Sequence, residues 1–158
     1  MKTQWKHFLA AAAAPLGVGI LSALLTFQNM MSFDQLIKPS ITPPSWLFPT
    51  VWTILYLLMG IASYLISVSA KASASEIQQA LFSYTSQLIF NFFWPLLFFN
   101  LHAYLFAFLW LCVLLFLILL TTLEFFEIDQ TAGYLLVPYL IWVTFAGYLN
   151  LTIYLLNK

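Results

Sequence analysis

Charged residues are spaced so widely along this chain that the sequence is suited to a membrane and not to water. Four blocks contain no Asp, Glu, Lys or Arg: residues 7–33, 39–70, 77–123 and 130–157, which are 27, 32, 47 and 28 residues long. A helix needs about 20 consecutive apolar residues to cross a bilayer. Each block can hold at least one such helix, so the sequence predicts an integral, multi-pass membrane protein.

The longest block must contain two helices, because one straight helix of that length would extend about 70 Å. The polar cluster Asn100-Leu101-His102 marks the break between them. We therefore predict an all-α membrane protein, in which residues 1–158 form a single domain, a bundle of five transmembrane helices. The predicted helices cover roughly 7–27, 45–68, 79–99, 103–125 and 131–155, and residues 28–44 form a proline-rich loop.

The first span has an alternative interpretation as a signal peptide. The segment "MKTQWKHFLAAAAAPLGVG" has a basic start, an apolar run and small residues, which are typical of such peptides. The apolar stretch continues to Phe27, which favours a retained helix. The lysines divide three to two between the two predicted membrane faces, so the positive-inside rule leaves the orientation open.

Composition excludes several classes of function. Only 6% of the residues are charged and the net charge is zero, so no basic patch is available for nucleic acid and the expected surroundings are membrane lipid. His7 and His102 fall at opposite membrane faces, about 30 Å apart, and Cys112 has no acid or histidine near it in sequence. We therefore predict no metal site and no required cofactor. The lack of charge within the spans also disfavours a proton-coupled transporter.

Polar and aromatic residues line up at helical spacing in three of the predicted helices. The aligned residues are Trp52, Tyr56, Met59 and Ser63 in the second span, Gln87, Asn91, Trp94 and Phe98 in the third, and Leu135, Pro138, Trp142, Ala146 and Asn150 in the fifth. Amide groups that faced lipid would be costly, so these faces should point into the bundle. Two interpretations stay open: hydrogen bonds that hold helices together, or an aromatic-lined pocket for a small molecule.

The first span carries a ridge of small residues, Ala11, Pro15, Gly19 and Ala23, at a spacing of four. Such a ridge lets another helix approach closely, either within one chain or in a dimer. We favour packing within the chain.

Three segments in the same order resemble the signature of a known family. They are "KPSITPPSWLFPTVWTILYLLMGIASYLI", "QLIFNFFWPLLFF" and "LLVPYLIWVTFAGYLN", and together they extend from about Lys38 to Asn150. The resemblance is to the TspO/MBR family, which comprises the tryptophan-rich sensory proteins of bacteria and the mitochondrial translocator protein, also called the peripheral-type benzodiazepine receptor.

The resemblance implies a five-helix bundle that often dimerises and that binds tetrapyrroles such as protoporphyrin IX, with haem and sterols as ligands of some members. It also implies binding of synthetic isoquinoline carboxamide and benzodiazepine ligands. Combined with the aligned faces, it gives the candidate ligand-binding residues Trp52, Tyr56, Gln87, Phe90, Asn91, Trp94, Trp142, Ala146, Leu149 and Asn150.

The proline-rich loop is expected to cover this pocket as a lid. Its candidate residues are Pro39, Pro43, Pro44 and Trp46. The prolines restrict the backbone before a ligand arrives, which lowers the entropy lost when the lid closes. Trp46 is predicted to anchor the second span at the membrane interface.

The residues on either side of the proline-rich segment carry two further expectations. Ser45 is predicted to cap the second span. Where many family members have a Trp-Tyr pair before the loop, this chain has Ser32 and Phe33, so one aromatic residue of the lid is missing.

Three functions are compatible with these features. The leading hypothesis is a receptor or sensor that binds a porphyrin. The second is an enzyme that degrades porphyrin with light and oxygen, with Trp52 and Trp142 as its catalytic residues. The third is a transporter of porphyrin or sterol, although the sterol motif of animal members is matched only loosely. That loose match, and the lack of a mitochondrial-type extension, favour a bacterial inner (cytoplasmic) membrane and, by resemblance, a homodimer.

Overall fold

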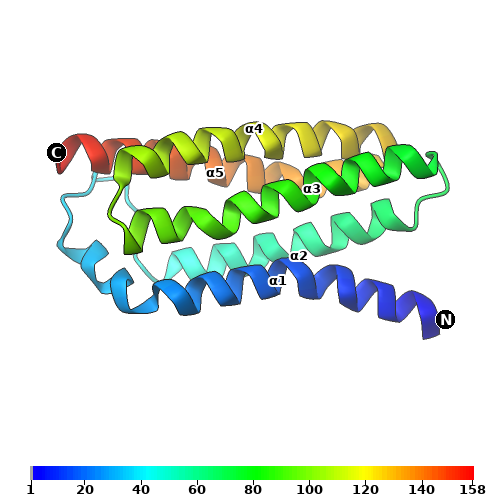
Figure 1. The fold of residues 1–158 in the computed structure, drawn as a ribbon, viewed down its shortest axis with the longest axis horizontal. Coiled ribbons are helices and arrows are strands. Elements are labelled where there is room, and N and C mark those ends of the chain that lie inside the picture. The colour runs from blue at the N-terminus through cyan, green and yellow to red at the C-terminus, as the bar shows by residue number, and fades with distance from the viewer. Residues whose placement is uncertain (1) are drawn as a thin grey trace.

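The computed structural model describes the backbone of residues 2–158 and the side chains of 5–30 and 33–158, so the Ser32 side chain lies outside the described residues. Within them the chain forms five α-helices and no β-strand, which confirms the predicted all-α bundle. The helices are α1 (Lys2–Met30), α2 (Leu47–Ser67), α3 (Ala74–Pro95), α4 (Tyr104–Ile128) and α5 (Gln130–Leu156). A 3-10 helix, η1 (Met31–Gln35), follows α1, and a π-helical turn, η2 (Leu96–Asn100), continues α3. The five helices lie side by side along the long axis of the molecule, and consecutive helices run in opposite directions (Figure 1).

α3 begins earlier than predicted because a side-chain cap sets its boundary. α3 begins at Ala74 because Ser73 and Glu76 form a reciprocal cap, with each side chain bonded to the other residue's backbone N–H. The predicted cap at Ser45 is wrong. α2 begins at Leu47, and the Ser45 hydroxyl donates instead to the Asp34 carboxylate at 3.2 Å, a charged acceptor that forms the stronger bond.

Four of the helices in the described chain, α1 from Trp5 onward, α2, α4 and α5, are long and apolar enough to cross a membrane. The predicted third span, α3, does not reach that hydropathy, because it carries polar side chains such as Ser83, Gln87 and Asn91. All three are buried inside the bundle. α3 nevertheless runs alongside its neighbours for most of their length (Figure 1), so protein, and not lipid, surrounds its polar face.

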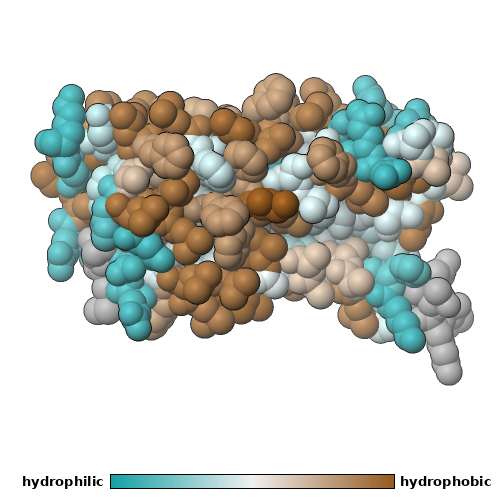
Figure 2. Space-filling view, in the orientation of Figure 1, coloured by the Kyte–Doolittle hydropathy of each residue, from teal (hydrophilic) through white to brown (hydrophobic). Residues whose placement is uncertain are grey.

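The outside of the bundle is apolar. Large hydrophobic side chains are exposed on it, including Leu24, Phe27, Phe82, Phe116 and Ile141. Figure 2 shows the brown, hydrophobic surface across the middle of the molecule and the teal, hydrophilic residues toward its two ends. This is the surface expected of a helix bundle surrounded by hydrocarbon.

The ridge of small residues on α1 packs within the chain, as predicted. A side chain at Gly19 would collide with the ring of Tyr56. On the facing helix, a Cβ at Gly60 would lie 2.7 Å from the Cα of Ala12. The two backbones therefore approach more closely than larger residues would allow. Ala23, at the far end of the ridge, is exposed and takes no part in this contact.

Asp129 alone connects α4 to α5 and holds that turn in place. Its carboxylate accepts hydrogen bonds from the backbone N–H groups of Thr131 and Ala132, at 2.9 and 3.2 Å, and so caps α5. Lys71, in the α2–α3 loop, donates to the other carboxylate oxygen at 2.5 Å. The hydrogen bond from Lys71, with those from the backbone, holds the pKa of Asp129 below its usual value near 3.8.

We expect the stability of the protein to fall as the pH drops through the lowered pKa of Asp129. A carboxylate with a depressed pKa contributes its full stabilisation above the unfolded value, about 3.9, and loses it as the pH falls through the folded value. Asp129→Asn keeps a cap oxygen but cannot titrate, so it should flatten this loss, while Asp129→Ala should lower stability by about 1 kcal/mol at neutral pH. Thermal unfolding in detergent at a series of pH values measures both effects.

The matched control is Glu127→Gln, at an exposed position two residues before Asp129. If Asp129→Asn and the unsubstituted protein lost stability over the same acid range by the same amount, the cap and ion pair would not be the cause.

Candidate ligand-binding site

A buried chain of hydrogen bonds joins three helices at the centre of the bundle. The Tyr56 hydroxyl on α2 donates to the Asn91 amide oxygen on α3 at 2.7 Å. The Asn91 amide nitrogen donates to the Tyr139 hydroxyl on α5 at 2.8 Å, and that hydroxyl donates to the Gln87 amide oxygen at 2.8 Å. All four side chains are buried. The amides therefore point into the bundle, as predicted, and they hold helices together.

Tyr139 was not among the candidate residues, because the predicted inward face of the fifth span passed through Pro138. The structure exposes Pro138 and buries Leu136, Tyr139, Val143 and Ala146. Adjacent residues on a helix differ by about 100° in direction. The sequence did contain a signal for Tyr139. A buried phenol needs a hydrogen-bond partner, and the amides of Gln87 and Asn91 in the third span need partners as well.

A second set of bonds ties α3 to α4 and α5 nearer the long loop. The Trp94 indole N–H donates to the Asn150 amide oxygen at 3.1 Å, and the Asn150 amide nitrogen donates to the backbone oxygen of Tyr104 at 2.7 Å. Leu149 and Ala146 are buried on the same helix, α5. Asn150 therefore contributes its amide oxygen and one amide N–H to contacts within the bundle.

Aromatic rings from α2 and α5 gather beside these networks. Trp52 stacks on Tyr56 with ring centroids 5.4 Å apart and meets Tyr139 edge-on at 6.1 Å. Trp142 meets Phe48 edge-on at 5.9 Å. The indole nitrogen of Trp142 is buried and has no hydrogen-bond partner in the structure. A buried donor without an acceptor is costly, and its position marks a place where a ligand can supply one.

The loop between α1 and α2 closes one end of the bundle through Phe33. Its ring lies 6.0 to 6.2 Å from the rings of Phe48, Phe98 and Phe99. A single aromatic residue thus fills the place beneath the loop, although the usual pair is absent. Pro39 and Pro43 are partly buried, and Pro44 is exposed. Trp46 is 67% exposed, which suits an interface anchor better than a pocket wall.

Two polar contacts fasten the loop. The Asn157 side chain, just beyond α5, accepts from the Ile37 N–H at 3.0 Å and donates to the Ile37 carbonyl at 2.9 Å. Asp34 accepts from Lys38 and Ser45, both at 3.2 Å. Lys38 also lies over the Phe33 ring, 4.5 Å from its centroid. The loop is therefore tied both to itself and to the end of α5.

Comparison with known proteins decides the family. The model of the TspO/MBR family matches residues 11–156. The chain belongs to the TspO/MBR family. It is 40% identical over 125 residues to the "Tryptophan-rich protein TspO" of Chlorobaculum tepidum, covering 79% of this chain and 78% of that protein. It is 39% identical over 150 residues to the "Tryptophan-rich sensory protein" of Cereibacter sphaeroides, covering 95% and 89%. It is 31% identical over 151 residues to the human "Translocator protein", covering 95% and 89%.

Family membership and the apolar helices together make this an integral membrane protein. The names of the relatives are consistent with a membrane receptor or sensor. The structure brings most candidate residues together around the two networks, but Phe90 lies apart from them. Its ring stacks on Trp110 of α4 at 4.4 Å, and the Trp110 indole donates to the Phe90 carbonyl at 2.8 Å. The ligand-binding role of all these residues stays a prediction.

We expect Asn91→Leu to destabilise the bundle by about 1–3 kcal/mol, because it leaves the Tyr56 hydroxyl buried without its acceptor. Thr144→Val is the matched control, since Thr144 is exposed and bonds only to its own helix. Unfolding in mixed micelles of increasing SDS content measures both variants. Equal stability of Asn91→Leu and the control would show that the network contributes nothing to the fold.

We expect Asn157→Ala to loosen the loop, because it removes both hydrogen bonds to Ile37. Amide exchange at Ile37 should become faster, while exchange in the middle of α4 stays unchanged. Hydrogen–deuterium exchange followed by mass spectrometry measures this, with Lys158→Ala as the neighbouring control. Unchanged exchange at Ile37 would show that the Asn157 side chain does not hold the loop.

Proposed function

We propose that this protein is a membrane receptor or sensor that binds a flat tetrapyrrole, protoporphyrin IX, between α2, α3 and α5 beneath the 28–44 loop. Synthetic isoquinoline carboxamide or benzodiazepine-type ligands would take the same site. The observation that carries the proposal is the ring cluster of Trp52, Tyr56 and Tyr139 near the bundle's centre, with the unpartnered indole N–H of Trp142 on the same helix as Tyr139.

The chemistry of these rings suits a flat, apolar macrocycle. Offset or edge-on aromatic contacts give about 0.5–1.5 kcal/mol each beyond the burial of apolar surface. The Trp142 N–H offers a donor to an acceptor on the ligand. Propionate groups on the macrocycle would have to reach the loop end, where Lys38 carries a positive charge that is now paired with Asp34. A propionate would therefore compete with Asp34 for Lys38.

The proposal extends to where the protein acts. The identities to the relatives from Chlorobaculum tepidum and Cereibacter sphaeroides exceed the identity to the human relative, which supports a bacterial inner membrane. By family resemblance the protein acts as a homodimer. No cofactor is proposed beyond the porphyrin, or haem in its place, as a ligand.

An enzymatic alternative rests on the stacking of Trp52 on Tyr56. In this alternative, light excites the bound porphyrin, which gives one electron to molecular oxygen and becomes a radical cation, while oxygen becomes superoxide. The indoles of Trp52 and Trp142, the first of them stacked on Tyr56 at 5.4 Å, would share the positive charge left on the macrocycle. Superoxide then adds to the radical cation, so both oxygen atoms enter the porphyrin, which is the substrate consumed, and no further oxidant or reductant is needed.

We expect a protoporphyrin titration of the detergent-solubilised protein in the dark to quench tryptophan fluorescence saturably, with a stable porphyrin spectrum. Trp52→Phe or Trp142→Phe should weaken binding by about two- to tenfold, since each loses one stacking surface or donor. Trp5→Phe is the control, because Trp5 is exposed near the start of α1 and is not among the candidate residues. No saturable quenching would overturn the binding proposal.

The same samples under illumination separate the binder from the enzyme. A new absorbance that needs the protein, oxygen and both tryptophans would favour the enzyme. Equal breakdown in all variants and in free detergent would remove that alternative. A transporter of porphyrin or sterol would instead show uptake into sealed vesicles above that of empty vesicles.

A further inference from the structure

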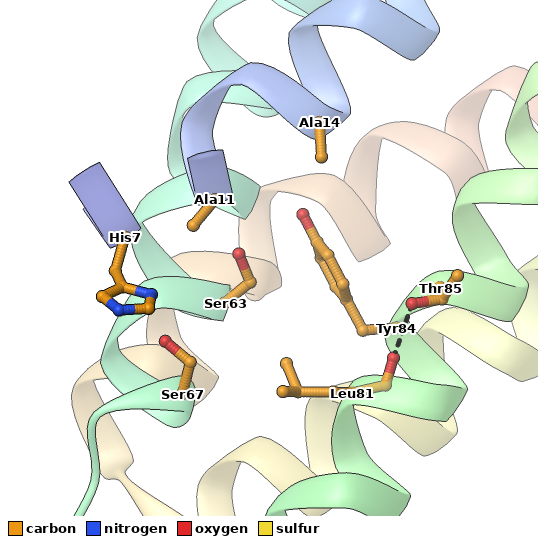
Figure 3. Close-up of a pocket in the computed structure, with 8 residues that line it drawn as sticks. All are labelled: His7, Ala11, Ala14, Ser63, Ser67, Leu81, Tyr84 and Thr85. Atoms are coloured by element: carbon orange, nitrogen blue, oxygen red, sulfur yellow. Dashed lines mark hydrogen bonds between the residues drawn. The ribbon is translucent and has the colours of Figure 1, made fainter. Parts of the chain in front are cut away.

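A cavity lies at the other end of the bundle from the long loop. It measures about 280 Å³ and is formed by α1, α2 and the first half of α3 (Figure 3). His7 and Ser67, near the start of α1 and the end of α2, stand at its outer side, and Tyr84 lies within it. None of the candidate porphyrin-binding residues lines it. The cavity is therefore separate from the proposed porphyrin site.

The cavity contains a hydrogen-bond donor without an acceptor. Tyr84 is only 5% exposed, and its hydroxyl makes no hydrogen bond of ordinary geometry in the structure, although the Ser63 hydroxyl is close enough to interact with it. Its ring is stacked on Phe125 of α4, with centroids 5.8 Å apart, so the ring is held in place. Figure 3 shows the hydroxyl directed across the cavity toward Ala14 on α1. A buried phenol in this state is costly unless something enters to accept its proton.

The other hydroxyls around the cavity have already donated their protons to their own helices. Ser63 donates to the Gly60 carbonyl at 3.0 Å, Ser67 to the Tyr64 carbonyl at 2.8 Å, and Thr85 to the Leu81 carbonyl at 2.8 Å. What they present to the cavity is oxygen lone pairs. A single group that accepts from Tyr84 and donates to a serine oxygen would satisfy both sides, and a hydroxyl group is such a group.

Access to the cavity comes from the shape of α1. Pro15 has no N–H, so it cannot bond to the carbonyl of Ala11, and proline within a helix bends it. In Figure 1 the N-terminal part of α1 leans away from α3. Small side chains, Ala11 and Ala14, line the cavity there. Ala14 on α1 and Thr85 on α3 both line the cavity and are exposed on the outside of the bundle, so the cavity opens between these two helices toward lipid.

We propose that this cavity binds the hydroxyl-bearing head of a glyceride-type lipid, such as a monoacylglycerol. One hydroxyl would accept from Tyr84 and donate to Ser63, and the acyl chain would leave between α1 and α3 into the membrane. The size fits: an apolar cavity of about 150 Å³ holds benzene, so this one accommodates a glycerol group and the first carbons of a chain. A porphyrin macrocycle is too large for it. The proposal is independent of the proposed porphyrin function.

The test is native mass spectrometry of the detergent-solubilised protein with two probes of equal chain length. One is 1-monolaurin, which has two hydroxyls, and the other is methyl laurate, which has none. We expect one retained copy of monolaurin, binding saturably and about tenfold more tightly than methyl laurate. Tyr84→Phe should weaken monolaurin binding by about three- to tenfold, the effect of one hydrogen bond, because phenylalanine keeps the stacking on Phe125.

The matched control is Tyr148→Phe, which removes the same hydroxyl from an exposed tyrosine of α5 and should leave binding unchanged. Ser63→Ala is the second variant, and it too should weaken monolaurin binding, so the test holds even if Tyr84→Phe does not fold. Equal retention of both probes, or monolaurin binding unaffected by either variant, would mean general lipid adhesion and would overturn the site. No retained monolaurin would mean that the cavity holds water only.

Discussion

The hydrogen bonds among Tyr56, Asn91, Tyr139 and Gln87 are the constraint on which the bundle's arrangement depends. Within hydrocarbon, a polar side chain without a partner costs several kcal/mol, so these four groups must meet. Meeting fixes the rotation of α2, α3 and α5 about their own axes. It also explains how α3, too polar to be recognised as a span by hydropathy, can lie in the bundle. Its polar face is covered by two other helices.

Because most buried polar groups in this core have hydrogen-bond partners, the few that lack one are informative. Among the described side chains, the buried polar atoms without a partner are the Trp142 indole nitrogen, the Tyr84 hydroxyl and one carboxylate oxygen of Glu124. The other Glu124 oxygen accepts from Gln79 at 3.0 Å. Trp142 belongs to the proposed porphyrin site, and Tyr84 belongs to the separate cavity. Each of the two proposed sites therefore contains one buried donor without a partner in the structure.

The sequence was sufficient for the helices but not for their faces. Blocks without charge must be buried in lipid or protein, so the number and order of helices could be predicted. The predicted start of α3 was too late, because the cap at Ser73 lets the helix begin before the acidic residue Glu76. For α5 the prediction placed Pro138 on the inward face, whereas the structure places Tyr139 there. Spacing within one helix does not show which of two adjacent residues has a partner on another helix. The cavity at Tyr84 could not be predicted, because it depends on the bend at Pro15 and on three helices at once.

The loop and the centre of the bundle are mechanically linked through α5. That helix carries Tyr139 and Trp142 in its middle, and it ends beside Asn157, which holds the loop at Ile37. A ligand that enters beside Trp142 must displace rings that pack between α2 and α5. Any shift of α5 along its axis is carried to Asn157, because a helix is stiff over this length. If the proposed site binds a ligand, its occupancy and the hold on the loop would be coupled, since both depend on the position of one helix. A receptor needs such a coupling, and here it requires no charge within the membrane.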